Sequence, residues 1–553
     1  MLPFEKNVNT TPTYHEVIES YKTLAADNKM FQFNQIGITD AGYPLHYGVL
    51  SKSKEFDPKV LQKQGKLVLL VNNAIHPGEP CGVDATMILV RDYLTKPNLM
   101  KLLDEVVLVF IPIYNIGGSL NRGSYSRANQ EGPEAYGFRG NAKNLDLNRD
   151  FIKCDSRNAQ TFNQLFNIWN PNIFIDNHTS NGADYQYTIT LIASQKDKLN
   201  KHLSSLMVNE MLPNLYKNMN ERKWEMTPYV YARSTPDEGI SGFLDLPRYS
   251  SGYATLHNCI SLMPETHMLK PYKDRVSSVY HFMDAMINWM NENQESIKNA
   301  KAQADQFVKE QNKFDVNWAL NFDKVESIIF KGYEAKYKPS LVTGQSRLYY
   351  DRNAPFEKEV PFYNSYKSSN TIEKPSAYII PQAYYKLIER LKWNGVEMER
   401  LSEDREVEGD YYYIKNYKTR DRAYEGHYLH YEIETEEKNL TRKFYKGDYL
   451  IKTNQVKNRY IIETLEPSAP DSYFAWNFFD GILMQKEYFS AYVFDDRAFE
   501  ILNNNPQLKR TFENKKEMDS KFSNDANAQL NFIYQNSDHY EQTYLMYPVA
   551  RIK

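Results

Sequence analysis

Short apolar runs alternate with helix-like segments along the first 300 residues of the chain. The runs hold four to eight residues rich in Val, Ile and Leu, which is typical of strands buried on both faces. Between the first two runs, apolar residues recur at helical spacing. This alternation predicts an α/β sheet with helices on both sides. The predicted strands are 66–71, 106–113, 172–175, 187–192 and 259–263, and the helical stripe is Val83, Met87, Val90 and Leu94.

The pattern changes after about residue 330. Tyr-rich alternating segments such as 411–417 and 428–433 are separated by turn residues, which favours antiparallel strands. Helical segments interrupt them near 381–391 and 496–504. We therefore predict a Tyr-rich, β-dominated α+β arrangement for the second half.

A polar, helix-favouring stretch over 291–312 lies between the α/β pattern and the Tyr-rich pattern. The predicted division is 1–300 for the first domain, 301–330 for a helical connection and 331–553 for an accessory domain of unknown role. The length of 553 residues leaves ample core for this number of domains.

Composition and charge exclude several classes of protein. Hydrophobic residues make up 41% and charged residues 25%, which are globular values. The net charge of −3 gives no electrostatic footprint for nucleic acid or an anionic membrane. The longest apolar stretch, 106–113, is far shorter than the roughly 20 residues that span a bilayer. Three cysteines build neither a disulfide framework nor a zinc ribbon.

The first candidate chemistry is the sequence His76-Pro77-Gly78-Glu79, which follows a predicted buried strand and opens a helix. Ligand sites in open α/β sheets gather beyond the carboxyl ends of strands. The same spacing recurs at His281 and Asp284, within a helical stretch beside apolar residues, where a half-buried helix face is the better interpretation. A helix-start glutamate that favours the helix dipole is the structural alternative for Glu79.

His178 favours a ligand role for His76 and Glu79 over a structural one, because it also ends a predicted buried strand. Two histidines and one glutamate from two strand ends form a three-ligand zinc set with an open fourth position, as catalytic zinc requires. His76, Glu79 and His178 are therefore the candidate metal ligands.

Further motifs follow in order: Asn144-Leu145-Asp146-Leu147-Asn148-Arg149-Asp150, and then Pro264-Glu265-Thr266-His267. With HPGE and DNH, these pieces make the chain resemble the zinc carboxypeptidase family. The resemblance covers roughly residues 65–280. It implies an α/β/α fold with a mixed, mostly parallel central sheet, a catalytic domain over 1–300 and one zinc ion per chain.

The resemblance also implies a role for each matching residue. His76, Glu79 and His178 match the zinc ligands, and Asp146 matches the carboxylate that orients a ligand histidine. Asn148 and Arg149 match the pair that binds the terminal carboxylate of the substrate, for which the planar guanidinium is suited. Glu265 matches the general base.

One further arginine is expected beside the scissile carbonyl. Arg139 is our choice, with Arg127 and Arg122 as competitors, because this loop departs from the family pattern. The family also uses a mobile tyrosine; Tyr249 and Tyr253 lie near its place, and neither matches clearly.

These roles predict a metallocarboxypeptidase that hydrolyses the C-terminal peptide bond of peptides by means of a zinc-activated water. Its partner is a peptide with a free C-terminal carboxylate. The alternatives are an amidase acting on cell-wall peptides and a catalytically silent peptide-binding protein. We expect a periplasmic or secreted protein whose signal peptide is not in this chain, with a cytoplasmic location as the alternative.

Other residues have weaker signals. The aromatic segment 471–479 has the composition of a sugar-stacking surface, but a core or domain interface is the favoured interpretation. His257, His267, His427, His430 and Cys81 are interpreted as structural residues.

Overall fold

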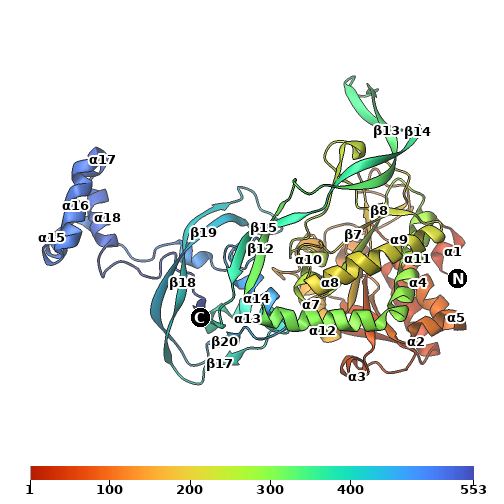
Figure 1. Ribbon diagram of the computed structural model, residues 1–553, viewed down its shortest axis with the longest axis horizontal. Coiled ribbons are helices and arrows are strands. Elements are labelled where there is room, and N and C mark those ends of the chain that lie inside the picture. The colour runs from red at the N-terminus through yellow and green to blue at the C-terminus, as the bar shows by residue number, and fades with distance from the viewer. Residues whose placement is uncertain (1) are drawn as a thin grey trace.

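The computed structural model describes residues 2–553, and a mixed sheet forms the centre of the first 300 of them (Figure 1). Its strands are β1 (Phe31–Ile38), β2 (Pro44–Leu50), β3 (Leu67–Asn72), β4 (Val106–Ile111), β5 (Ile173–Asp176), β6 (His178–Ser180), β7 (Ile189–Ala193), β8 (Met226–Pro228) and β11 (Ile260–His267). Their order is β1-β2-β4-β3-β5-β11-β7-β8, and β6 also pairs with β11. The inner strands β4, β3, β5 and β11 are parallel neighbours, which confirms the predicted fold class.

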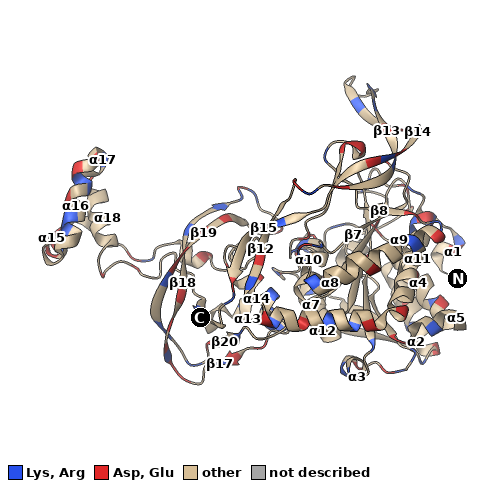
Figure 2. Cartoon of the chain, viewed as in Figure 1, with Lys and Arg blue, Asp and Glu red and all other residues tan. Residues whose placement is uncertain are grey.

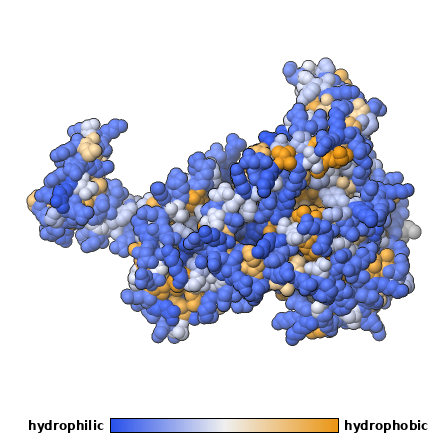
Figure 3. Space-filling view, viewed as in Figure 1, coloured by the Kyte–Doolittle hydropathy of each residue, from blue (hydrophilic) through white to orange (hydrophobic). Residues whose placement is uncertain are grey.

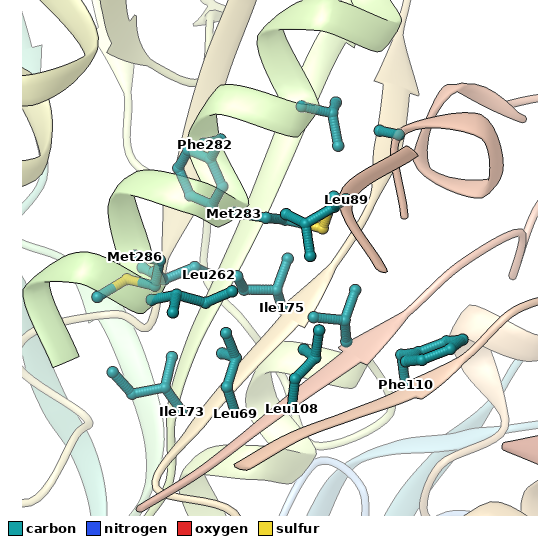
Figure 4. Close-up of a cluster of buried hydrophobic side chains, with 14 of the residues drawn as sticks. Leu69, Leu89, Leu108, Phe110, Ile173, Ile175, Leu262, Phe282, Met283 and Met286 are labelled. Atoms are coloured by element: carbon teal, nitrogen blue, oxygen red, sulfur yellow. The ribbon is translucent and has the colours of Figure 1, made fainter. Parts of the chain in front are cut away.

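Helices cover both faces of this sheet. They are α2 (Tyr14–Asp27), α4 (Cys81–Thr95), α7 (Arg157–Trp169), α8 (Lys201–Leu206), α9 (Leu212–Glu221), α10 (Ser250–Leu256), α11 (Tyr272–Glu292) and α12 (Gln294–Glu310). Successive side chains of a strand point to opposite faces. Leu69 therefore packs with α4 and α11 in one core, which Figure 4 shows, and Leu70 packs with α7 and α10 in the other. The predicted stripe of α4 faces the first core, with Val83, Met87 and Val90 buried.

The segment 301–330 differs from the predicted helical connection. α12 ends at Glu310, and the chain continues as β12 (Lys313–Leu320) and β13 (Glu326–Pro339). Phe314 and Val316 are buried at a spacing of two, so their apolar period is that of a strand. Most of the other residues in the segment are polar. Composition alone therefore does not reveal that the helix gives way to a strand.

The second half is built mainly from β-strands, which confirms the predicted β-dominated α+β arrangement. β12 pairs with β15 (Tyr366–Glu373), and β13 and β14 (Ser346–Tyr363) form a long hairpin beside the short strands β10 (Ile240–Ser241) and β9 (Tyr231–Ala232). A further sheet has the order β17-β20-β16-β21-β18-β19. Its strands are β16 (Ala377–Ile380), β17 (Glu399–Arg400), β18 (Arg405–Thr419), β19 (His430–Phe444), β20 (Tyr449–Lys452) and β21 (Ala550–Ile552). The predicted helices appear as α13 (Tyr385–Trp393) and α15 (Ala491–Asn504).

A small helical bundle lies apart from the rest of the chain (Figure 1). It contains α15, α16 (Pro506–Met518), α17 (Ser520–Ser523) and α18 (Ala526–Gln535), and it has its own apolar core around Phe494 and Tyr534. The two connections to the bundle meet at its base, where the Lys486 N–H donates to Glu541 Oε2 over 2.6 Å. The bundle is therefore an insertion in an otherwise continuous fold.

The two halves share the core on the α7 side of the central sheet. It combines Phe162 and Phe166 of α7 with residues of the second half, including α14 (Asn458–Leu465). The aromatic segment 471–479 belongs to this core, because Tyr473, Phe474 and Trp476 are fully buried. Its interpretation as an interface rather than a sugar-binding surface is confirmed.

The outer surface is mostly hydrophilic in the face that Figure 3 shows, with separate apolar patches. Acidic and basic residues are interspersed, as along α12 in Figure 2. Along residues 2–553, no helix combines the length and the apolar character that crossing a bilayer requires.

A chain ending after residue 311 should fail to fold into a soluble protein, because the shared core would lose its second-half side chains. A chain in which a short Gly-Ser linker replaces 487–540 should keep its melting temperature within roughly 4 °C, since the bundle has a separate core. Size-exclusion chromatography and thermal melts followed by circular dichroism measure both effects. A soluble, cooperatively melting 2–311 chain would contradict the shared core.

Candidate functional site

The candidate residues converge at the carboxyl ends of three neighbouring parallel strands. His76 and Glu79 lie between β3 and α4, and His178 opens β6 directly after β5. In the β6–β11 pairing, Glu265 lies opposite His178. Residues that are far apart in the sequence are therefore brought to one edge of the sheet, as the motif order predicted.

His76, Glu79 and His178 form a buried cluster. One ligand atom from each lies within 4.8 Å of the others, and the three side chains are at most 4% exposed. Both histidines turn Nδ1 toward the glutamate: His76 Nδ1 is 3.4 Å from Oε1, and His178 Nδ1 is 3.2 Å from Oε2. The carboxylate thus lies between the two imidazoles.

The Nε2 atom of each histidine faces a second carboxylate. His76 Nε2 lies 2.8 Å from Asp146 Oδ1, as the sequence predicted for Asp146. His178 Nε2 lies 3.0 Å from Asp176 Oδ2, although this pair lacks hydrogen-bond alignment. Asp176 was not predicted. Its position two residues before His178 is a usable signal, because an extended chain places such residues on the same face.

The donor set fits a zinc ion. Two imidazole nitrogens and one carboxylate are the ligands of many catalytic zinc sites, and carboxylates behind the histidines fix their tautomers. His76 Nδ1 is buried without a hydrogen-bond partner and faces the cluster, as a ligand nitrogen must. His76, Glu79 and His178 are therefore the residues that could hold the metal.

Glu265 faces this cluster from β11 and is 8% exposed. Burial, together with the neighbouring Glu79 carboxylate, raises the pKa of Glu265 to about 8, although His178 opposes the shift. A carboxyl group whose pKa lies near neutrality is suited to accept and return protons.

The cluster and Glu265 line one cavity of about 210 Å³. The other polar residues of its wall are Arg127, Arg139, Asn148, Arg149, Thr179, Ser180, Asn181 and Tyr249. The remaining wall residues, which are aliphatic, aromatic or sulfur-containing, are Ile192, Tyr229, Phe243 and Met263. The cavity therefore combines the candidate metal site, the candidate base and the candidate carboxylate-binding pair.

Two of the three candidate arginines enter this cavity. Arg127 Nη1 donates to Glu79 Oε1 over 2.8 Å, and Arg139 Nε donates to Asp146 Oδ2 over 2.9 Å. Arg122 instead donates to backbone carbonyls near residue 11 and does not line the cavity. Gly78 permits this arrangement, because a Cβ there would lie 2.6 Å from the Arg127 side chain.

Asn148 and Arg149 also line the cavity. The Ser250 N–H donates to Asn148 Oδ1 over 2.9 Å, and the Arg149 guanidinium lies 4.6 Å from the centre of the Tyr249 ring. Of the two candidate tyrosines, only Tyr249 lines the cavity. Tyr253 is fully buried and donates to Asn394.

The histidines and the cysteine interpreted as structural lie outside the metal cluster. His257, His267, His427 and His430 contact other partners, and Cys81 packs beside Thr179 and Thr266. Burial raises the pKa of the Cys81 thiol, which disfavours a thiolate ligand.

Two relatives match most of the length of the chain. Carboxypeptidase 2 of Trichophyton rubrum is 22% identical over 487 residues, which are 84% of this chain and 83% of the relative. Carboxypeptidase 2 of Trichophyton equinum is 22% identical over 494 residues, with the same coverage.

Solved structures give weaker matches. A metallo-carboxypeptidase from Pseudomonas aeruginosa has 14% identity and a TM-score of 0.40, over 52% of this chain and 70% of that one. A metallo-carboxypeptidase from Burkholderia cenocepacia has 15% identity and a TM-score of 0.38, over 51% of this chain and 70% of that one.

The family model of the zinc carboxypeptidases matches residues 17–324, which is more than half of the chain. The chain belongs to the zinc carboxypeptidase family and is a peptide-bond hydrolase.

Proposed function

We propose that this hydrolase removes the C-terminal residue of peptides, with Glu265 as general base and Asn148 and Arg149 as the carboxylate-binding pair. The observation that carries the proposal is that one cavity holds the metal cluster, a buried carboxyl group and a cationic binding pair. A substrate whose terminal carboxylate met Arg149 would enter the same cavity that Glu265 and the metal cluster line.

His76, Glu79 and His178 would hold the zinc ion, which when bound lowers the pKa of a water molecule and polarises a carbonyl group. Glu265 takes a proton from the attacking water and later passes it to the leaving nitrogen. Its burial supports both steps, because a carboxyl group with a pKa of about 8 gains and loses a proton at modest cost near neutral pH.

Arg139 is the better candidate to stabilise the negative charge on the carbonyl oxygen. The Nη1 and Nη2 groups of Arg127 are already engaged by Glu79 and by the Thr179 carbonyl. Its Nε donates to Gln130. The Arg139 side chain is 46% exposed, and its Nε and Nη2 groups contact Asp146. Its Nη1 group lies 3.6 Å from Glu79 Oε1, beyond hydrogen-bond distance, and so remains a donor for a substrate.

The carboxylate-binding pair is arranged to donate hydrogen bonds. Because Asn148 Oδ1 accepts the Ser250 N–H, the amide NH₂ is the group left for a substrate. Stacking on Tyr249 restricts the plane of the Arg149 guanidinium. Two oriented donors of this kind select a chain that ends in a carboxylate.

An apolar pocket of about 260 Å³ shares the wall residues Ile192, Tyr229 and Phe243 with the catalytic cavity. Its lining is mainly apolar, and its charged members, Lys196 and Glu326, form an ion pair with each other. We propose that it favours a large apolar C-terminal side chain, because burying an unpaired charge there is costly.

Glu265→Gln should reduce kcat by about 10²–10⁴-fold, because the amide cannot accept the proton from water. Its zinc content should stay at one per chain, whereas His178→Ala should lose zinc. Metal analysis beside a peptide-hydrolysis assay measures both. His281→Ala, which alters the second His–acid spacing on α11, is the control and should change neither. Near-native turnover by Glu265→Gln would exclude its role as base.

Arg149→Ala should lower kcat/KM by roughly 10–100-fold on a blocked dipeptide with a free carboxylate, since a hydrogen bond to a charged group contributes about 1.5–3 kcal/mol. The same dipeptide with a C-terminal amide should be a poor substrate for both enzymes, with no further loss in the variant. Steady-state kinetics on the matched pair tests this. Equal use of acid and amide would contradict the exopeptidase proposal.

Blocked dipeptides ending in Phe should give a kcat/KM roughly tenfold or more above those ending in Lys or Glu, because the adjoining pocket is apolar. Initial rates on such a panel, with cell-wall peptides included, measure the preference. A preference for a charged end would contradict the pocket assignment, and faster turnover of cell-wall peptides would favour the amidase alternative.

A further inference from the structure

The loop that carries the carboxylate-binding pair and the loop that packs against it each touch an acidic residue of the second half. The first loop, 144–150, holds Asp146, Asn148 and Arg149. The second loop, 245–250, holds Tyr249, which lies against Arg149. Neither acidic residue lines the catalytic cavity, so any effect on the reaction passes through these loops.

Glu425 contacts the first loop. Its Oε2 accepts the backbone N–H of Asp146 over 2.8 Å, across 279 residues of sequence. The carboxylate of Asp146 in turn contacts His76 and Arg139. The turn around Glu425 is itself fixed, because His427 Nε2 lies 2.7 Å from Asp155 Oδ2, five residues beyond the loop. Glu425 therefore sets the position of the residue on which the metal site and Arg139 both depend.

Asp471 contacts the second loop through Arg248. One carboxylate oxygen lies 2.9 Å from Arg248 Nη2, and the other accepts the backbone N–H of Arg248 over 2.9 Å. The Arg248 guanidinium also lies over the rings of Tyr424 and Trp476, at 5.5 and 5.1 Å from their centres. The pair is almost fully buried, since the Asp471 side chain is 0% and that of Arg248 is 8% exposed.

Both contacts act on the same pair of substrate-binding residues. Arg248 directly precedes Tyr249, whose ring orients Arg149, and Ser250, whose N–H holds Asn148. Tyr424 links the two contacts, because it neighbours Glu425 in sequence and stacks on Trp476. One cluster of the second half thus fixes the two loops relative to each other.

We propose that Glu425 and Asp471 are positioning residues that the second half supplies to the active site. This inference rests on the proposed function of Asn148 and Arg149. The accessory half then has a defined role, because it holds the loop of the two donors against Tyr249 and Ser250, which orient them. A small displacement of such donors weakens binding strongly, because their alignment with the substrate is lost.

Asp471→Asn tests the second loop in the full-length enzyme. It should raise KM for a free-carboxylate dipeptide on the order of tenfold while kcat changes much less, because carboxylate binding depends on Arg149. Affinity for 3-phenylpropionate, a small apolar carboxylate, should fall by a similar factor in calorimetry. Zinc content should not change. Asp480→Asn, an acidic residue of the same region that contacts His430 instead, is the control.

Glu425 provides a second test if Asp471→Asn does not fold. Glu425→Ala should lower kcat/KM on the order of tenfold, and Glu425→Gln should restore it, because the amide oxygen can still accept the Asp146 N–H. Glu432→Ala is a matched control: both glutamates have a φ near +50°, and Glu432 forms an ion pair with Lys418.

The outcomes separate the inference from the proposed function. Folded variants with a lower melting temperature but unchanged kcat, KM and carboxylate affinity would show a structural role only and overturn the inference. Equal kinetics for Glu425→Ala, Glu425→Gln and wild type would overturn it as well. A wild-type enzyme that cleaves no free-carboxylate peptide would overturn the proposed function and, with it, this inference.

Discussion

Glu79, Asp146 and Asp176 surround His76 and His178 with three carboxylates in a region that solvent scarcely reaches. Burial alone would raise the pKa of Glu79, yet Arg127 and the histidines hold it well below its usual range. The same balance holds for Asp146, which His76 and Arg139 keep ionised. An isolated buried charge is costly, so each carboxylate requires a cation beside it. Arg127 and Arg139 provide this compensation for Glu79 and Asp146, whereas burial beside Glu79 raises the pKa of Glu265 despite the same two arginines.

The tyrosine content of the chain has a packing explanation. More than half of its 43 tyrosines lie after residue 320, and several are buried in the core that the two halves share. Some of their hydroxyl groups form hydrogen bonds there: Tyr378 donates to Glu466, and Tyr460 pairs with Tyr473. Tyrosine combines a large apolar surface with one polar group, which suits a wide interface that also binds buried charges.

Patterns of neighbouring residues in the sequence predicted the strands of the central sheet and the candidate metal ligands, because both depend on short stretches of chain. The strands at 67–72 and 106–111 follow from apolar runs, and HPGE with DNH located His76, Glu79 and His178. The partners of these residues depend on long-range contacts. Glu425 lies 279 residues from Asp146, and Asp471 lies 223 residues from Arg248, so no spacing rule relates them. The same limit applies to Arg127 and Arg139, which only the folded loop distinguishes from Arg122.

The order of strands in the sheet of the second half has a consequence for synthesis. β21, formed by residues 550–552, lies between β16 and β18, which precede it in the chain by more than 130 residues. Until β21 leaves the ribosome, both neighbours keep an unpaired edge, and such edges promote aggregation. Arg551 then pairs with the buried Glu466 and completes the charge balance of this region. The metal ligands are therefore synthesised long before the strand that fills the centre of the second-half sheet, and this sheet cannot close until that strand arrives.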